Sequence, residues 1–120
     1  MRSILLAASL IAFSAVAAYA GDEDVMATRF GNTTVIHDVL GTSRVYYNPD
    51  HTFAAASWLC DVSGTWKIEN GKICLYAEKK PALYSLKYSN PECDVIAAHK
   101  VGDKWKQEKG DFELVQGIQN

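Results

Sequence analysis

The dipeptide Asn70-Gly71 constrains the fold more than any other feature of the sequence, because it lies between two segments with alternating apolar and polar residues. Trp66-Lys67-Ile68-Glu69 precedes it, and Lys72-Ile73-Cys74-Leu75 follows it. Asn-Gly is preferred in two-residue type I′ turns, whose backbone twist matches that of antiparallel strands. The sequence therefore predicts an antiparallel hairpin in which Lys67 lies opposite Cys74.

Short alternating segments of the same kind occupy most of the chain after residue 32, and turn residues separate them. We expect strands over 33–40, 44–47, 52–58, 62–69, 72–75, 93–99, 104–107 and 112–116, with 83–88 as a further candidate. This pattern predicts an all-β fold, a small antiparallel meander of seven or eight strands. A barrel-like or strongly curved sheet is favoured because closure removes exposed edges, and a sandwich is the alternative.

The first twenty residues have the three parts of a secretory signal peptide. Arg2 gives a positive start, Ile4 to Ala18 is an apolar run, and Ala18-Tyr19-Ala20 supplies small residues before a cleavage site. The apolar run is shorter than the ~20 residues that a membrane-spanning helix needs. We expect a cleavable signal helix over 1–20, a single antiparallel β domain over 21–120, and a periplasmic or secreted location.

The charge pattern argues against nucleic acid as a partner. The chain has 12 Lys and Arg against 14 Asp and Glu, and the basic residues form no extended patch. No second apolar run is long enough to cross a membrane. We expect a monomer with no membrane span after signal cleavage.

The three cysteines are candidates for a disulfide, because an exported chain folds in an oxidising compartment. Period-two alternation places Cys60 on the core face with Val62 and Trp66, whereas Cys74 points to the other face. Side chains on opposite faces cannot form a disulfide, so Cys74–Cys93 is favoured and Cys60 is a buried thiol. Cys60–Cys93 stays an alternative, and a bulge at Gly64 would shift the register and remove the argument.

Four separated segments of the sequence share a pattern: Tyr46-Tyr47-Asn48-Pro49-Asp50-His51-Thr52-Phe53, Ser63-Gly64-Thr65-Trp66, Gly71-Lys72-Ile73-Cys74-Leu75, and Cys93. Together they resemble a group of small exported bacterial β proteins of unknown function, whose pattern is Asp-Gly-Thr, Gly-x-Trp, Leu-Cys and a later cysteine. The resemblance implies a β fold and a Cys74–Cys93 bridge, and it supplies no activity. His51 replaces the glycine of the pattern, which argues against a positive φ there.

Gly64-Thr65-Trp66 also resembles the glycine-x-tryptophan signature of lipocalins and the glycine-threonine-tryptophan of avidin-like barrels. We favour a simpler interpretation, in which Trp66 is a core residue beside a glycine at a bend.

No catalytic, cofactor or metal motif is evident. The three histidines, His37, His51 and His99, are too far apart in sequence for a readable metal motif. The sequence also lacks a nucleophile elbow, a Walker loop and a Cys-x-x-Cys pair. We therefore expect a protein that is not an enzyme and needs no cofactor.

Four aromatic residues are the candidates for contact with a ligand or partner: Trp58, Trp66, Tyr84 and Tyr88. They favour a non-enzymatic, lipocalin-like binding module for a small apolar ligand or an envelope protein. The alternative is an envelope structural or interaction protein whose Cys60 makes an intermolecular contact.

A non-reducing peptide map of the exported protein should recover Cys74 linked to Cys93, with Cys60 as a free thiol. In the chain-entropy model this bridge stabilises the fold by roughly 3 kcal/mol. A peptide in which Cys60 is linked to either partner would contradict the parity argument.

Overall fold

The computed structural model describes residues 24–57 and 60–119, so the expected signal peptide and Trp58 lie outside the described residues. The strands are β1 (Thr33–Asp38), β2 (Gly41–Tyr47), β3 (Thr52–Ser57), β4 (Asp61–Glu69), β5 (Lys72–Lys79), β6 (Glu92–Val95), β7 (Lys104–Gln107) and β8 (Gly110–Val115). The short helix α2 (Tyr84–Lys87) lies between β5 and β6, and a helical turn over 24–27 precedes β1. In these described ranges, no helix is long and apolar enough to span a membrane.

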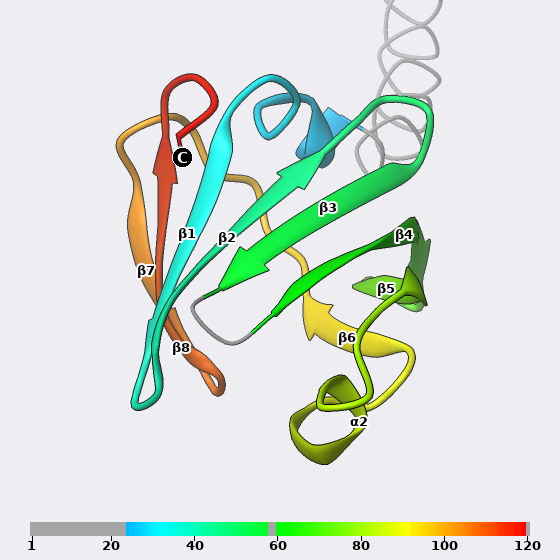
Figure 1. Cartoon of the computed structure of the whole chain (residues 1–120). Helices are drawn as coiled ribbons and strands as arrows, with labels where there is room; N and C mark the ends of the chain where they lie inside the picture. Colours follow the sequence, from blue (N-terminus) through cyan, green and yellow to red (C-terminus); the bar gives the residue numbers. More distant parts are fainter. Residues whose placement is uncertain (1–23, 58–59, 120) are drawn as a thin grey trace, which may run out of the picture.

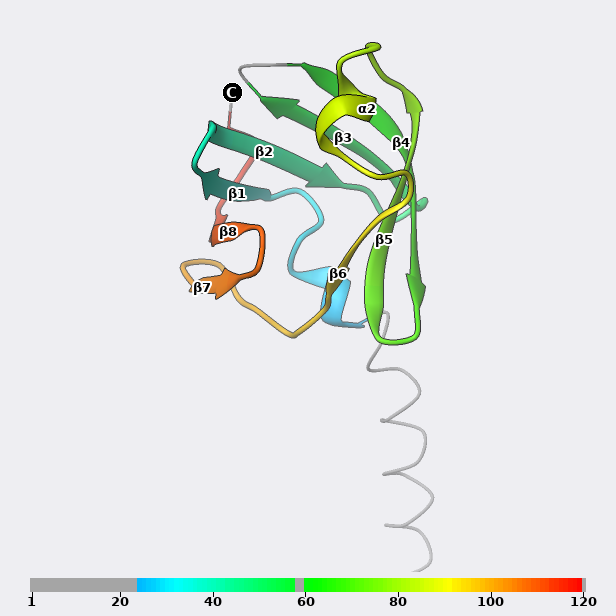
Figure 2. The ribbon, with the colours of Figure 1, turned by 90° about the horizontal axis from the view of Figure 1, so that it is seen from below.

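All eight strands form one antiparallel sheet in the order β6-β5-β4-β3-β2-β1-β8-β7. Neighbours in this sheet are also neighbours in sequence, apart from β1 and β8, the first and last strands, which pair with each other. The sheet curves strongly into a half-barrel, as the two orthogonal views show (Figures 1 and 2). The predicted all-β fold and strongly curved meander are confirmed.

The β4–β5 hairpin has the register that the Asn70-Gly71 turn predicts. Asn70 and Gly71 have φ values of 53° and 73°, as a type I′ turn requires, and Lys67 lies opposite Cys74. Turn chemistry therefore fixes which residues of β4 and β5 lie opposite one another near the turn.

A β-bulge interrupts this hairpin farther from the turn. Ser63 lies opposite Lys79 whereas Gly64 lies opposite Ala77, so the extra residue belongs to β5. The bulge is thus outside the segment between Gly64 and the turn, and the register at Cys74 is unaffected. A Cβ at Gly64 would overlap the carbonyl oxygen of Tyr76, so only glycine fits where the β5 backbone approaches.

Trp66 is the centre of the core, with 1% of its surface exposed. Its indole N–H donates to the carbonyl oxygen of Asn48 at 3.0 Å, and the His51 ring stacks on it at 3.9 Å between centroids. His51 has a φ of 69°, so the expectation of no positive φ at this position is wrong. The cost of a left-handed residue, about 1–2 kcal/mol, is offset here by the stacked ring and by the hydrogen bond from Trp66 N to His51 O.

Residues 83–88 do not form the candidate strand, because α2 places Tyr84 and Tyr88 one helical turn apart on the same side. Leu86, which an extended segment would align with them, is 82% exposed instead. The strand expected over 93–99 is also shorter, since β6 ends at Val95.

The two edges of the sheet, β6 and β7, are joined by side chains rather than by a backbone ladder, and we call this junction the seam. Three side chains donate hydrogen bonds to alternate carbonyls in and just after β6: Lys109 Nζ to Cys93 O at 3.0 Å, Gln107 Nε2 to Val95 O at 2.8 Å, and Arg29 Nη2 to Ala97 O at 3.0 Å. These bonds satisfy backbone acceptors that an edge strand would otherwise leave unpaired.

Replacing Gly64 with alanine should lower the free energy of unfolding by about 3 kcal/mol, because the added methyl meets backbone that cannot move aside. Gly71→Ala is the matched control, since φ is +73° there and nothing lies within 4 Å of an added Cβ. It should cost only the left-handed strain of about 1–2 kcal/mol. Urea unfolding of both variants measures the difference, and equal losses would contradict the close-approach argument.

Candidate functional site

The concave face of the half-barrel holds a cavity of about 110 Å³. Its apolar floor comes from the inward-facing positions of β2 to β5: Val45, Phe53, Ala55, Val62 and Leu75. The register explains this gathering, because Val45, Ala55 and Val62 lie opposite one another across three neighbouring strands. Strand alternation therefore aligns the apolar side chains of separate segments into one surface.

Helix α2 and the residue that follows it contribute two aromatic rings to this cavity. Tyr84 and Tyr88 both line it, with ring centroids 5.0 Å apart, and Tyr84 is only 6% exposed. Of the four predicted contact residues, these two meet at the cavity. Trp66 lies in the core instead, and Trp58 is outside the described residues.

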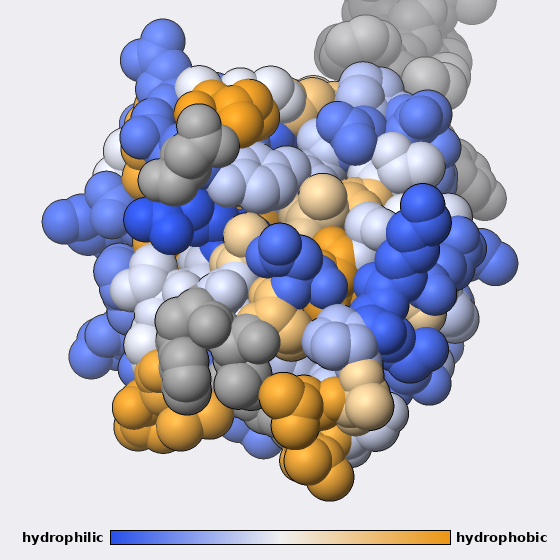
Figure 3. Space-filling model, in the orientation of Figure 1, coloured by the Kyte–Doolittle hydropathy of each residue, from blue (hydrophilic) through white to orange (hydrophobic). Residues whose placement is uncertain are grey.

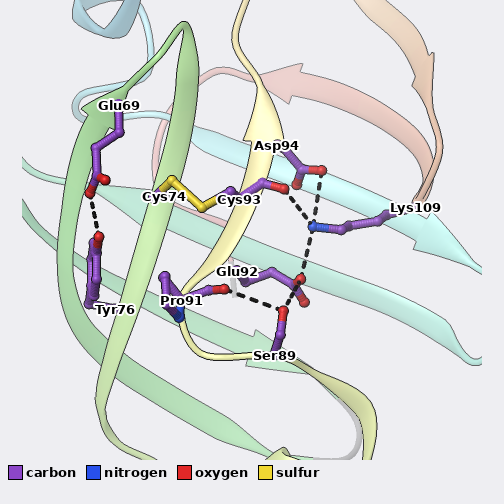
Figure 4. The surroundings of a disulfide bond; sticks show 9 residues. All are labelled: Glu69, Cys74, Tyr76, Ser89, Pro91, Glu92, Cys93, Asp94 and Lys109. Carbon is purple, nitrogen blue, oxygen red and sulfur yellow. Dashed lines mark hydrogen bonds and ion pairs between the residues drawn. A yellow bond between two sulfur atoms is a disulfide. The ribbon is translucent and has the colours of Figure 1, made fainter.

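Charged side chains of β6 and of the β7–β8 turn form another wall of the cavity, and Figure 4 shows these side chains. Lys109 Nζ lies 3.0 Å from Glu92 Oε1 and 3.1 Å from Asp94 Oδ1, and all three residues line the cavity. Burial by itself lowers the pKa of Lys109, but the hydrogen bonds and charges of Glu92 and Asp94 outweigh burial and raise that pKa above 10.5. The Lys109 ammonium group thus links the β7–β8 turn to β6 at the seam, and Lys109 also lines the cavity.

The Cys74–Cys93 disulfide lies on the other side of β6 from this wall (Figure 4). Cys74 and Cys93 are directly opposite in the β5–β6 register, with Cα atoms 4.1 Å apart. This is the pair that strand parity favours, and Cys74 is nevertheless only 3% exposed. Glu92 and Asp94 flank Cys93 in sequence, so alternation turns both carboxylates inward.

Sequence reasoning missed these carboxylates, although a signal for them was present. Once Cys93 is assigned to the outer face, parity predicts that its two acidic neighbours face the core, where carboxylates are rare unless paired. No comparable signal exists for Lys109, because it lies in the turn between β7 and β8 and its partners are more than ten residues away.

Cys60, a free cysteine, also lines the cavity and is half-buried. Its backbone N–H donates to Ser57 Oγ at 3.1 Å, and its carbonyl oxygen accepts from Ser57 N at 3.0 Å. Cys60 lies directly before β4, and it is half-buried where parity predicts a buried thiol. The alternative, an intermolecular contact through Cys60, stays a prediction.

Exposed apolar residues occur on two elements beside the cavity. Val39 and Leu40 form the turn between β1 and β2, and Leu83 and Leu86 belong to the α2 segment. The space-filling view shows hydrophobic surface over both elements at the same end of the molecule (Figure 3). Asp38 and Tyr84, next to these residues, line the cavity, so apolar surface flanks it on two sides.

The histidines do not gather in one place. His37 bonds to Thr42 at 3.0 Å, His51 stacks on Trp66, and His99 stacks on Trp105 with centroids 3.5 Å apart. Within residues 24–57 and 60–119, no group of three His, Cys, Asp or Glu side chains is placed to hold a metal ion.

Comparison with known proteins gives no matching family model, no matching curated protein and no matching solved structure. The resemblance to small exported bacterial β proteins therefore stays a prediction. Interpretation of the cavity depends on its own geometry and charge.

The Tyr47 hydroxyl at the cavity should make stability fall at alkaline pH. Burial, with a smaller opposing effect of Arg29, raises the pKa of Tyr47 from 10.0 to about 12. A pKa raised by folding gives stability that is complete below the unfolded-state value and is lost as pH rises through the folded-state value.

Tyr47→Phe removes this titration. The variant should therefore gain about 2 kcal/mol in unfolding free energy relative to wild type between about pH 9 and about pH 11.5. Urea unfolding at both pH values checks the shift, with the pH 7 difference as the reference. A difference that stays constant with pH would contradict the assignment.

Proposed function

We propose that the protein is an exported, non-enzymatic binding module that holds a small apolar group at one end of its half-barrel. The observation that carries this proposal is the cavity itself, with a floor of five apolar side chains and the rings of Tyr84 and Tyr88. Apolar concave sites with a few polar groups are the usual form of ligand-binding sites in proteins.

The size of the cavity limits what enters it. Pockets for drug-sized ligands measure roughly 300–1,000 Å³, whereas a dry cavity of about 150 Å³ accepts benzene. A volume of about 110 Å³ is smaller than that benzene site and therefore fits one short alkyl segment. Burial of each methylene group is worth about 0.8 kcal/mol, so a short chain binds weakly unless other contacts contribute.

The exposed residues beside the cavity supply such contacts. Val39 and Leu40 on one side, and Leu83 and Leu86 on the other, offer apolar surface to the part of a ligand that remains outside. Exposed apolar surface that gathers beside a concave site is a feature of binding regions. A periplasmic or secreted location is part of the proposal and is supported by the disulfide, because such bonds persist in oxidising compartments.

Filling the cavity tests the proposal. Ala55 lies on its floor, and Ala55→Leu should weaken the binding of hexan-1-ol at least tenfold, because the added side chain occupies the space of the alkyl chain. NMR titration of the protein with hexan-1-ol gives both the affinity and the residues whose signals move.

Ala54→Leu is the matched control, since Ala54 is exposed and is the preceding residue of β3, with its side chain on the opposite face. It should bind hexan-1-ol as the wild type does, and both variants should melt cooperatively. If wild type and Ala55→Leu bind hexan-1-ol equally, or if signals far from the cavity move instead, the proposed function is wrong.

A further inference from the structure

We propose that the ligand of this cavity carries a cationic head, such as an amine, next to its short apolar group. This inference rests on the proposed function and adds the chemical class of the ligand. It depends on the charge of the cavity wall, which lines the same cavity as the apolar floor.

The charged side chains of the cavity are mainly acidic. Among the described residues that line it, three are carboxylates, Asp38, Glu92 and Asp94, and one is a cation, Lys109. The Debye length is about 8 Å at physiological ionic strength, so partly buried groups on one cavity wall are weakly screened from its contents. A cation entering this space meets the wall of Glu92, Asp94 and Lys109, where carboxylates outnumber the ammonium group.

The wall already binds an ammonium group. Lys109 Nζ contacts one oxygen of each carboxylate, Oε1 of Glu92 and Oδ1 of Asp94, and it also donates to the carbonyl oxygen of Cys93. One positive charge therefore lies beside two negative charges, so the three side chains together carry a net negative charge. The geometry shows that this wall accommodates an alkylammonium, the same chemical group as the proposed head.

Asp38, the last residue of β1, places a third carboxylate at the cavity. Its Oδ1 accepts hydrogen bonds from the backbone N–H groups of Leu40 at 2.8 Å and Gly41 at 3.1 Å. These two hydrogen bonds hold the Asp38 carboxylate at the turn between β1 and β2.

An amphiphile with an anionic head does not fit this arrangement. Its alkyl chain would pack on the floor in the same way, but its carboxylate would face Asp38, Glu92 and Asp94, and like charges at a binding site cost affinity. The affinity of a neutral alcohol should lie between those of the cationic and the anionic amphiphile. Chains of equal length with different heads therefore separate the contribution of the floor from that of the wall.

The experiment uses hexylamine, hexan-1-ol and hexanoate with the wild-type protein at neutral pH and low salt. NMR titration should give an affinity for hexylamine at least tenfold higher than for hexanoate, with hexan-1-ol between them. Each bound probe should also slow the alkylation of Cys60 by iodoacetamide, because this thiol lines the cavity.

Two variants, Asp94→Asn and Asp111→Asn, test whether the preference for hexylamine depends on the charge of the cavity wall. Asp111 is exposed and faces Lys106 at 3.9 Å, so its replacement removes the same charge from another ion pair away from the cavity. Asp94→Asn should reduce the preference for hexylamine over hexan-1-ol at least fivefold, whereas Asp111→Asn should leave it unchanged. If Asp94→Asn does not fold, Glu92→Gln provides the same comparison.

The outcomes distinguish the two proposals. If hexanoate binds as tightly as hexylamine, or if Asp111→Asn and Asp94→Asn have equal effects, the cationic head is wrong and the apolar site stands. If none of the three probes binds or protects Cys60, the proposed function itself is wrong.

Discussion

Hydrogen bonds from side chains to alternate carbonyls along the edge of β6 hold the half-barrel in its curved form. An edge strand exposes a row of backbone groups, and a sheet that does not close must satisfy them in another way. Here Lys109, Gln107 and Arg29 donate to this row from the β7–β8 hairpin and from the segment before β1. Side chains thus take the place of the missing ladder, and the two ends of the sheet are kept close together without a ninth strand.

The candidate site exists because of this seam. Its floor needs only the alternation of β2 to β5, but its charged wall needs β6 and the β7–β8 turn to face each other across the concave side. The disulfide links β6 to β5 on one face of the sheet. On the other face, the ion pairs of Lys109 with Glu92 and Asp94 link β6 to the β7–β8 turn. One strand of four residues therefore carries both covalent and electrostatic constraints.

The sequence predicts the parts of this protein that depend on local order. Alternation and turn residues locate the strands, and Asn70-Gly71 sets the register at Cys74, because these features act over a few residues. The helical form of α2 and the positive φ of His51 depend on tertiary packing and were not predicted. At the site, Tyr84 and Tyr88 were predicted as contact residues, whereas Lys109 was not, since no local pattern specifies a partner across a seam.

The pairing of β1 with β8 has a consequence for the order of folding. Residues in this ladder are between 74 and 82 positions apart, whereas the other pairs of strands join sequence neighbours. Closing so long a loop costs chain entropy before its contacts form, so local hairpins form early and this ladder forms late. Before residues 110–115 have been synthesised, the edge of β1 that faces β8 is unpaired. The complete sheet can therefore form only after β8 has been synthesised.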